Sequence, residues 1–251
     1  MRKGLSTSII RADVGKIDQL PWFSHYELTF FKQKDVEKVM RFLKERKASF
    51  GVHAPFVFRY CQVHPQPTSL NPTLRHDTLK KNQKCIELAK SLGADYVILH
   101  FPSAKQSESW LDIYEDIVQE IACLKTNGIQ IRIENVYCND CFHTSNDYKD
   151  FLERTNLTIC VDIGHLLIDS QIYGLDPVEF VESLKPFISE FHIYYADLIE
   201  YEKCHHKAWK NEKKFLQLLE YIRDIDADFV LEPSPECLEG FENLLKYLEE
   251  L

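Results

Sequence analysis

Short apolar runs recur along this chain, and a helix-like segment or a loop with room for one follows each of them. The candidate strands span residues 5–10, 26–31, 50–53, 96–100, 129–134, 157–162, 190–192 and 229–232. Helical spacing or capping marks residues 35–47, 73–92, 107–127, 145–154, a segment beginning near 176–177, 212–225 and 239–251. Repeated βα units predict a parallel sheet with right-handed crossovers, and eight of them predict closure into a (β/α)8 TIM barrel.

The main alternative to a closed barrel is a doubly wound open sheet. That fold binds phosphates with a glycine-rich loop after its first strand, and Ser-Thr-Ser-Ile-Ile-Arg at residues 6–11 contains no glycine. The first unit of the predicted barrel is the least regular, because residues 12–22 are few and Pro21 interrupts them. We therefore expect the closed barrel.

Length, charge and cysteine content narrow the class of protein. The 251 residues fit one barrel, so we expect a single domain over residues 1–251. A net charge of −9 disfavours non-specific binding to nucleic acid, which depends on Lys and Arg. Residues 1–10 lead into no long apolar segment, which predicts no signal peptide or membrane span and a cytoplasmic protein.

Cysteines give weaker signals. We expect the eight cysteines to be reduced thiols, because they are scattered through a chain of this size. Cys138 and Cys141 form one Cys-x-x-Cys pair, which without a second pair is a weak zinc or redox signal.

Six of the predicted strands end on a residue type that binds metals. In chain order these residues are His53, His100, Glu134, Asp162, His192 and Glu232. Strands of a parallel barrel direct their C-terminal ends to one mouth, where barrel enzymes hold their active sites. Imidazole and carboxylate are ligands of zinc, manganese and iron. The pattern therefore predicts a metal site at that mouth.

Asp162 and His165 form the most specific short motif. The carboxylate ends a strand, and we expect the histidine to enter the mouth from the following loop. The alternative is an Asp that caps the next helix with a surface histidine nearby. Beside the other strand-end residues, the metal interpretation is the better one.

The other strand-end residues also have structural alternatives. Glu134 and Glu232 are costly to bury unless they are paired or bind a metal, and Arg132 is a possible partner. The alternative for His192 is a core histidine that is hydrogen-bonded to Tyr194. The alternative for His53 and His100 is packing under proline-containing loops. The remaining histidines without a partner pattern are interpreted as surface residues: His25, His64, His76 and His143.

These residues, in this order, resemble the xylose isomerase-like TIM-barrel superfamily, which includes endonuclease IV. The resemblance covers nearly the whole chain and is strongest from His53 to Glu232. It implies that Glu134, Asp162, His192 and Glu232 hold one divalent metal, as the equivalent residues do in sugar isomerases and epimerases.

The resemblance to endonuclease IV implies further ligands for a three-zinc cluster. His53 in His-Ala-Pro-Phe and His100 in His-Phe-Pro-Ser match the pair that binds a second zinc with Glu134, and His165 matches a third-zinc ligand. The last two ligands form Asp-x-His in that family, and Cys204 and His206 are the nearest match. Glycine-containing loops are replaced by residues 137–141 and 207–212, which counts against DNA cleavage.

The leading hypothesis is a metal-dependent isomerase or epimerase of a sugar, sugar phosphate or related hydroxy-carbonyl compound. One to three Zn²⁺ or Mn²⁺ ions are expected, with Glu134 and Glu232 as the acid–base pair and His165 and His100 orienting substrate hydroxyls. The second hypothesis is an endonuclease IV-like multinuclear zinc phosphodiesterase, which makes nucleic acid the less favoured partner. A third is a metal-binding barrel without catalysis. Substrate identity, oligomeric state and the role of Cys138 and Cys141 are left open.

Overall fold

The computed structural model describes residues 1–251 apart from 12, 127, 200 and 202. Eight parallel strands pair in chain order, and the eighth pairs with the first, so that the sheet closes into a barrel. The strands are β1 (Lys3–Ser6), β2 (His25–Leu28), β3 (Ser49–His53), β4 (Tyr96–His100), β5 (Gln130–Glu134), β6 (Thr158–Asp162), β7 (Ile188–Ile193) and β8 (Asp228–Leu231). The predicted (β/α)8 TIM barrel is confirmed.

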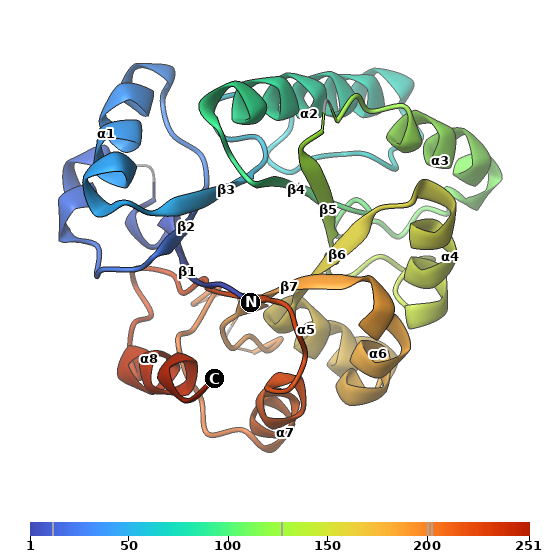
Figure 1. Cartoon of the computed structure of the whole chain (residues 1–251). Coiled ribbons are helices and arrows are strands. Elements are labelled where there is room, and N and C mark those ends of the chain that lie inside the picture. The colour runs from blue at the N-terminus through green and yellow to red at the C-terminus, as the bar shows by residue number, and fades with distance from the viewer. Residues whose placement is uncertain (12, 127, 200, 202) are drawn as a thin grey trace.

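Helices surround the ring of strands on the outside (Figure 1). The α-helices of the described chain are α1 (Val36–Arg46), α2 (Pro72–Leu92), α3 (Tyr114–Ala122), α4 (Ser145–Thr155), α5 (Ile163–Tyr173), α6 (Pro177–Leu184), α7 (Lys213–Ile222) and α8 (Phe241–Glu250). Short 3-10 helices are η1 (Thr7–Ile10), η2 (Val14–Gln19), η3 (Gln33–Asp35), η4 (Leu111–Ile113) and η5 (Lys185–Phe187). None of the described helices has both the length and the hydrophobicity that a membrane-spanning helix needs.

Local chemistry explains where the helices begin and end. The Asn71 side chain accepts a hydrogen bond from the backbone N–H of Thr73, and Pro72 opens α2 at a position where no amide donor is needed. Gly93 ends α2 at φ 85°, in the left-handed region that glycine tolerates. Val39, Phe42 and Leu43 are buried on one face of α1, and such side chains each contribute about 1.5–3 kcal/mol on burial.

Three elements differ from the sequence predictions. The strand expected at residues 5–10 is β1 (Lys3–Ser6) followed by η1. The helix expected at 107–127 is reduced to η4 and α3, and its expected last residue lies outside the described part. The loop expected after Asp162 is the helix α5, which the sequence pattern did not reveal because α5 is buried nearly all round.

Polar side chains fill the lower part of the barrel interior. At the N-terminal ends of the strands, Arg132 pairs with Glu190 and with Asp228 (2.9 Å), and Arg2 pairs with Asp228 (2.6 Å). We call these residues the ion-pair layer. Arg132, a possible partner of Glu134 and Glu232 in the sequence analysis, therefore pairs with acids at the N-terminal end of the barrel.

The Tyr96 ring packs against the arginines of this layer. The Arg132 guanidinium carbon is 3.7 Å from the centroid of the ring. Gly51 provides the space, because a Cβ atom at this position would lie 2.1 Å from Cζ of Tyr96. The fully buried Tyr96 donates to Glu190 of the ion-pair layer (2.9 Å), and its Oη also lies 3.4 Å from Glu27.

Candidate metal centre

Four strands bring metal-binding atoms to one point at the C-terminal end of the barrel. His192 Nδ1 lies 3.4 Å from Oε2 of Glu232, 3.6 Å from Oε2 of Glu134 and 3.8 Å from Oδ2 of Asp162. All four side chains are at most 5% exposed. The complete mononuclear set expected from the sequence is therefore brought together.

Three of these four atoms are buried without a hydrogen-bond partner among the described residues: Glu134 Oε2, Asp162 Oδ2 and His192 Nδ1. Burial, and then the neighbouring Glu134, raises the pKa of Asp162 well above its usual value. Burial also raises the pKa of Glu232 to about 7. Carboxylates crowded in this way without a cation must take up protons. The residues therefore fit a divalent cation, which would satisfy the unpartnered atoms and relieve the repulsion.

Glu27 belongs to the same group, although the sequence analysis did not select it. Its carboxylate is 3.1 Å (Oε1) and 3.2 Å (Oε2) from Nε2 of His192, and Oε1 is 3.3 Å from Nδ1 of His53. Burial opposes its ionisation, but His192 and His53 hold the pKa of Glu27 well below its usual value. The signal in the sequence was a lone acid inside the apolar run of β2. Together with the mononuclear set, Glu27 and His53 form what we call the site layer.

A second cluster adjoins the first through Glu134. Its Oε2 lies 3.0 Å from Nε2 of His53 and 3.4 Å from Nε2 of His100, and the two imidazole nitrogens are 2.9 Å apart. Burial opposes protonation of His53, but Glu134 and Glu27 raise its pKa well above the usual value. The geometry can hold a second ion that shares Glu134 with the first.

His165 reaches the mouth from the first turn of α5, and not from a loop as expected. Asp162 caps this helix, because its Oδ1 accepts a hydrogen bond from the backbone N–H of His165 (2.8 Å). Asp162 therefore combines the two alternatives given for it: its Oδ1 caps α5, and its Oδ2 faces His192 in the candidate site. His165 Nδ1 bonds to the carbonyl oxygen of Asn135 (2.9 Å), which leaves its Nε2 with a lone pair.

His206 also lies at the mouth of the barrel, but Cys204, which was predicted to bind a metal beside it, is not available as a ligand. His206 Nδ1 bonds to the carbonyl oxygen of Glu232 (2.9 Å), and burial lowers its pKa to about 3, so the ring is neutral. Cys204 forms a disulfide with Cys237, and a disulfide sulfur offers no thiolate to a metal. The prediction of a Cys204 ligand is therefore wrong. The expectation of reduced cysteines is also wrong for this pair, while the other six are free, Cys138 and Cys141 among them.

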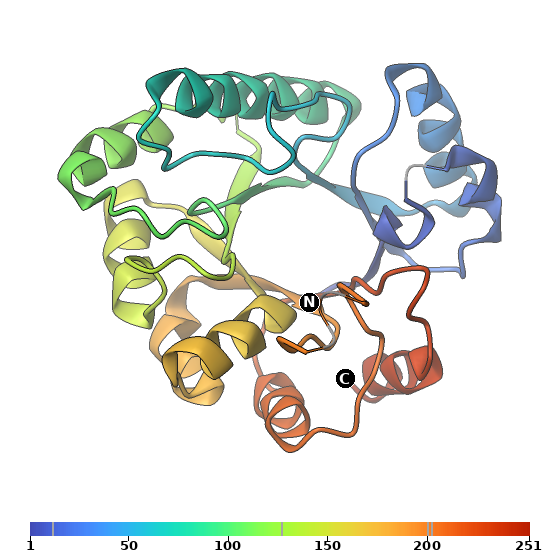
Figure 2. The same cartoon turned by 180° about the vertical axis from the view of Figure 1, so that it is seen from behind.

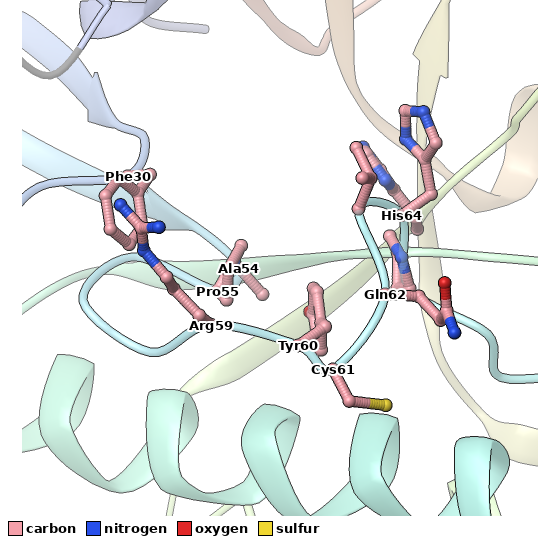
Figure 3. A pocket seen from close by; sticks show the side chains of 11 residues that line it. Phe30, Ala54, Pro55, Arg59, Tyr60, Cys61, Gln62 and His64 are labelled. Carbon is pink, nitrogen blue, oxygen red and sulfur yellow. The ribbon is translucent and has the colours of Figure 1, made fainter.

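Two adjoining cavities open at the mouth. One of about 250 Å³ is lined by Glu134, His165, His206 and Glu232, and a second of about 500 Å³ shares His100 with it. His64 is exposed, as predicted for a surface residue, and it lines both cavities. Figure 3 shows the second cavity, and Figure 2 shows the face of the barrel seen from behind the view of Figure 1.

Arg59 is the cation of the second cavity. Its guanidinium carbon lies 4.8 Å from the centroid of the Phe30 ring, and the two side chains lie together on one side of the cavity in Figure 3. No carboxylate of the described chain forms an ion pair with it. An anionic group of a ligand therefore has a free partner here.

His25 differs from its predicted surface position. His25 is fully buried inside the barrel and bonds to Ser49 Oγ (2.8 Å) and Tyr96 Oη (2.9 Å). Burial lowers its pKa to about 4. It is a structural histidine below the site layer.

Both the sequence and the structure of this chain are similar to those of known proteins. Residues 19–198 match the family described as xylose isomerase-like TIM barrel. Over 100% of this chain and 98% of the other, the structure is similar to a D-tagatose 3-epimerase-like protein, with 23% sequence identity and a TM-score of 0.71. An L-ribulose 3-epimerase is 16% identical over 99% of this chain and 86% of its own, with a TM-score of 0.72. Endonuclease IV from Thermus thermophilus is 15% identical over 100% of both chains, with a TM-score of 0.67. At these identities the structural likeness establishes the fold and not the reaction.

Proposed function

Because this chain belongs to the xylose isomerase-like TIM barrel family, we propose that it is a metal-dependent isomerase or epimerase of a sugar, sugar phosphate or related hydroxy-carbonyl compound. One observation carries the proposal: three carboxylates surround Nδ1 of His192 within 3.8 Å, with buried atoms that lack partners in the described chain. Glu134, Asp162, His192 and Glu232 would hold the ion. Zn²⁺ and Mn²⁺ both suit this mixture of oxygen and nitrogen ligands.

The bound cation would polarise a substrate carbonyl and orient it as a Lewis acid and template. Glu134 and Glu232 are the acid–base pair of the proposal. Removal of a proton from the carbon beside the carbonyl needs one carboxylate, and its return to that or the adjacent carbon needs an acid. Burial raises the pKa of Glu232 to about 7, near the range that suits proton transfer in neutral solution.

His165 and His100 position the substrate in this proposal. Burial lowers the pKa of His165, so its ring is neutral and Nε2 can accept a hydrogen bond from a substrate hydroxyl. His100 is 25% exposed, and it lines both cavities. Arg59 in the larger cavity favours a substrate with an anionic end, and a sugar phosphate has one.

The test begins with protein purified without chelator or a nickel column. Metal analysis is expected to find Zn or Mn, and a panel of ketoses and ketose phosphates in deuterated water is expected to give solvent-derived deuterium at the epimerised carbon. Glu134→Gln and Glu232→Gln should each lower kcat by about 10²–10⁴-fold, the usual contribution of general acid–base catalysis. Protein that holds no transition metal, and gains no activity with added Mn²⁺ or Zn²⁺, would refute the proposal.

A phosphodiesterase with two metals is the second candidate function. The position of Glu134 Oε2 beside both His53 and His100 favours it, because this geometry suits a carboxylate shared by two ions. The disulfide at Cys204 counts against a third zinc. Two bound zincs per chain, with cleavage of an abasic-site oligonucleotide and no deuterium exchange into sugars, would establish this alternative.

A further inference from the structure

Glu27 touches two of the proposed metal-binding histidines at once, on the side of each ring that faces away from the metal-binding nitrogen. Its carboxylate is 3.1 Å from Nε2 of His192 and 3.3 Å from Nδ1 of His53. The opposite nitrogens face the site: His192 Nδ1 towards the carboxylates and His53 Nε2 towards Glu134. We propose that Glu27 is a positioning residue that fixes the tautomer and ring orientation of both histidines. This inference rests on the proposed metal site.

The chemistry of imidazole makes the two contacts of each ring depend on one another. A neutral ring that binds a metal through one nitrogen carries its proton on the other. An ionised carboxylate only accepts hydrogen bonds, so Glu27 selects the Nε2–H form of His192 and the Nδ1–H form of His53. Each ring is then left with its lone pair directed into the site.

Glu27 is suited to this role by its own surroundings. Its side chain is fully buried, and His53 and His192 are its ion-pair partners within the described chain. Tyr96 Oη lies 3.4 Å from Oε2, and the backbone carbonyl oxygen of Glu27 accepts a hydrogen bond from Oγ1 of Thr7 (3.1 Å). The carboxylate is thus held between the two rings by the barrel itself.

Glutamine in place of Glu27 separates this role from packing. Its amide has nearly the same shape, but it is uncharged and its nitrogen donates, so one neutral oxygen has to serve both histidines in place of a carboxylate. Loss of a partner that orients a metal-binding histidine typically weakens metal affinity by about 10–100-fold.

The experiment compares wild type, Glu27→Gln and Asp169→Asn. Asp169 is also a buried acid, 4% exposed, which bonds to the backbone N–H of Cys138 and touches neither histidine. Zinc affinity is measured by competition with a chelator on metal-stripped protein. Glu27→Gln should bind zinc about 10–100-fold more weakly with the same number of ions at saturation, and Asp169→Asn should match wild type.

A second measurement reads the tautomers directly. In zinc-loaded wild type labelled with ¹⁵N-histidine, long-range ¹H–¹⁵N correlation should place the proton of His192 on Nε2 and that of His53 on Nδ1. The opposite tautomer on either ring would overturn the proposal, whether or not any variant folds. Unchanged zinc affinity in folded Glu27→Gln would also overturn it, and loss of one ion at saturation would show that Glu27 is instead a ligand. Wild type that binds neither zinc nor manganese would refute the proposed function itself.

Discussion

The ion-pair layer and the site layer lie in the same barrel, yet they balance charge in opposite ways. In the ion-pair layer, two arginines meet the carboxylates of Glu190 and Asp228. In the site layer, the ion-pair partners of the four buried acids in the described chain are histidines, and several carboxylate oxygens have no hydrogen-bond partner there. The charges of the ion-pair layer are thus balanced within the fold, whereas the site layer has unpartnered atoms that the proposed cation would contact.

The largest effect is expected from Arg132→Met. Removal of the guanidinium leaves Glu190 and Asp228 buried without this partner, and breaking a buried pair in this way costs about 3–5 kcal/mol. Urea unfolding measures the change. The matched control is Arg154→Met on the surface, where water screens the pair with Glu115 and the loss should be far smaller. Equal losses in the two variants would mean that the ion-pair layer contributes no more than a surface contact.

The second effect concerns metal addition. A ligand that binds only the folded state stabilises it by about 2.7 kcal/mol at 100 times its Kd, so Zn²⁺ or Mn²⁺ should raise the thermal midpoint of stripped protein. Glu134→Gln, which removes a carboxylate oxygen facing both clusters, should reduce this shift. A midpoint that does not respond to either metal would show that the site layer needs no cation.

The third effect is that replacing an acid by its amide should change the stability of metal-free protein in opposite directions in the two layers at neutral pH. Burial and Glu134 raise the pKa of Asp162, so Asp162→Asn removes a repulsion and should stabilise the fold by about 1.4 kcal/mol for each pKa unit relieved. Asparagine also remains a good helix cap for α5. Asp228→Asn should instead destabilise, because it removes the partner of Arg2 and Arg132. Urea unfolding of both variants gives the comparison, and destabilisation by both would contradict it.

The smallest effect is a dependence on pH. Burial opposes ionisation of Asp228, but Arg2 and Arg132 hold its pKa below the usual value. A depressed carboxyl pKa contributes stability above the unfolded value of about 3.9, and this contribution is lost as the pH falls through the folded pKa. Unfolding in urea between about pH 3 and 6 should therefore show a weaker acid dependence for Asp228→Asn than for wild type. If the free energy of unfolding depended on pH equally in both proteins, ionisation of Asp228 would not contribute to stability.

Sequence patterns predicted the barrel and most of the site because both depend on local order. Strand ends in a parallel barrel converge, so a residue at the end of a run is placed by counting along the chain. Glu27 escaped this rule because the strand was predicted over residues 26–31, which placed Glu27 near its start, whereas β2 ends at Leu28. The helix α5 was missed because it is apolar on nearly every face, with Leu166, Leu167 and Ile168 in succession.

Contacts between distant loops were beyond the reach of such patterns. Cys204 and Cys237 are 33 residues apart, and nothing in their spacing indicates that the segments after β7 and β8 meet. His64 lies in a segment without regular spacing, so only the folded chain places it at the mouth.

Tyr96 joins the two layers inside the barrel, because its ring packs against Arg132 and its Oη lies 3.4 Å from Glu27. The proposed ion and substrate would therefore both use the C-terminal mouth, because buried side chains occupy the interior below it. Exchange of the metal and turnover of the substrate would then share one route. A substrate analogue resting in the mouth should delay the extraction of the metal by a chelator, and the length of that delay would report how long the analogue stays bound.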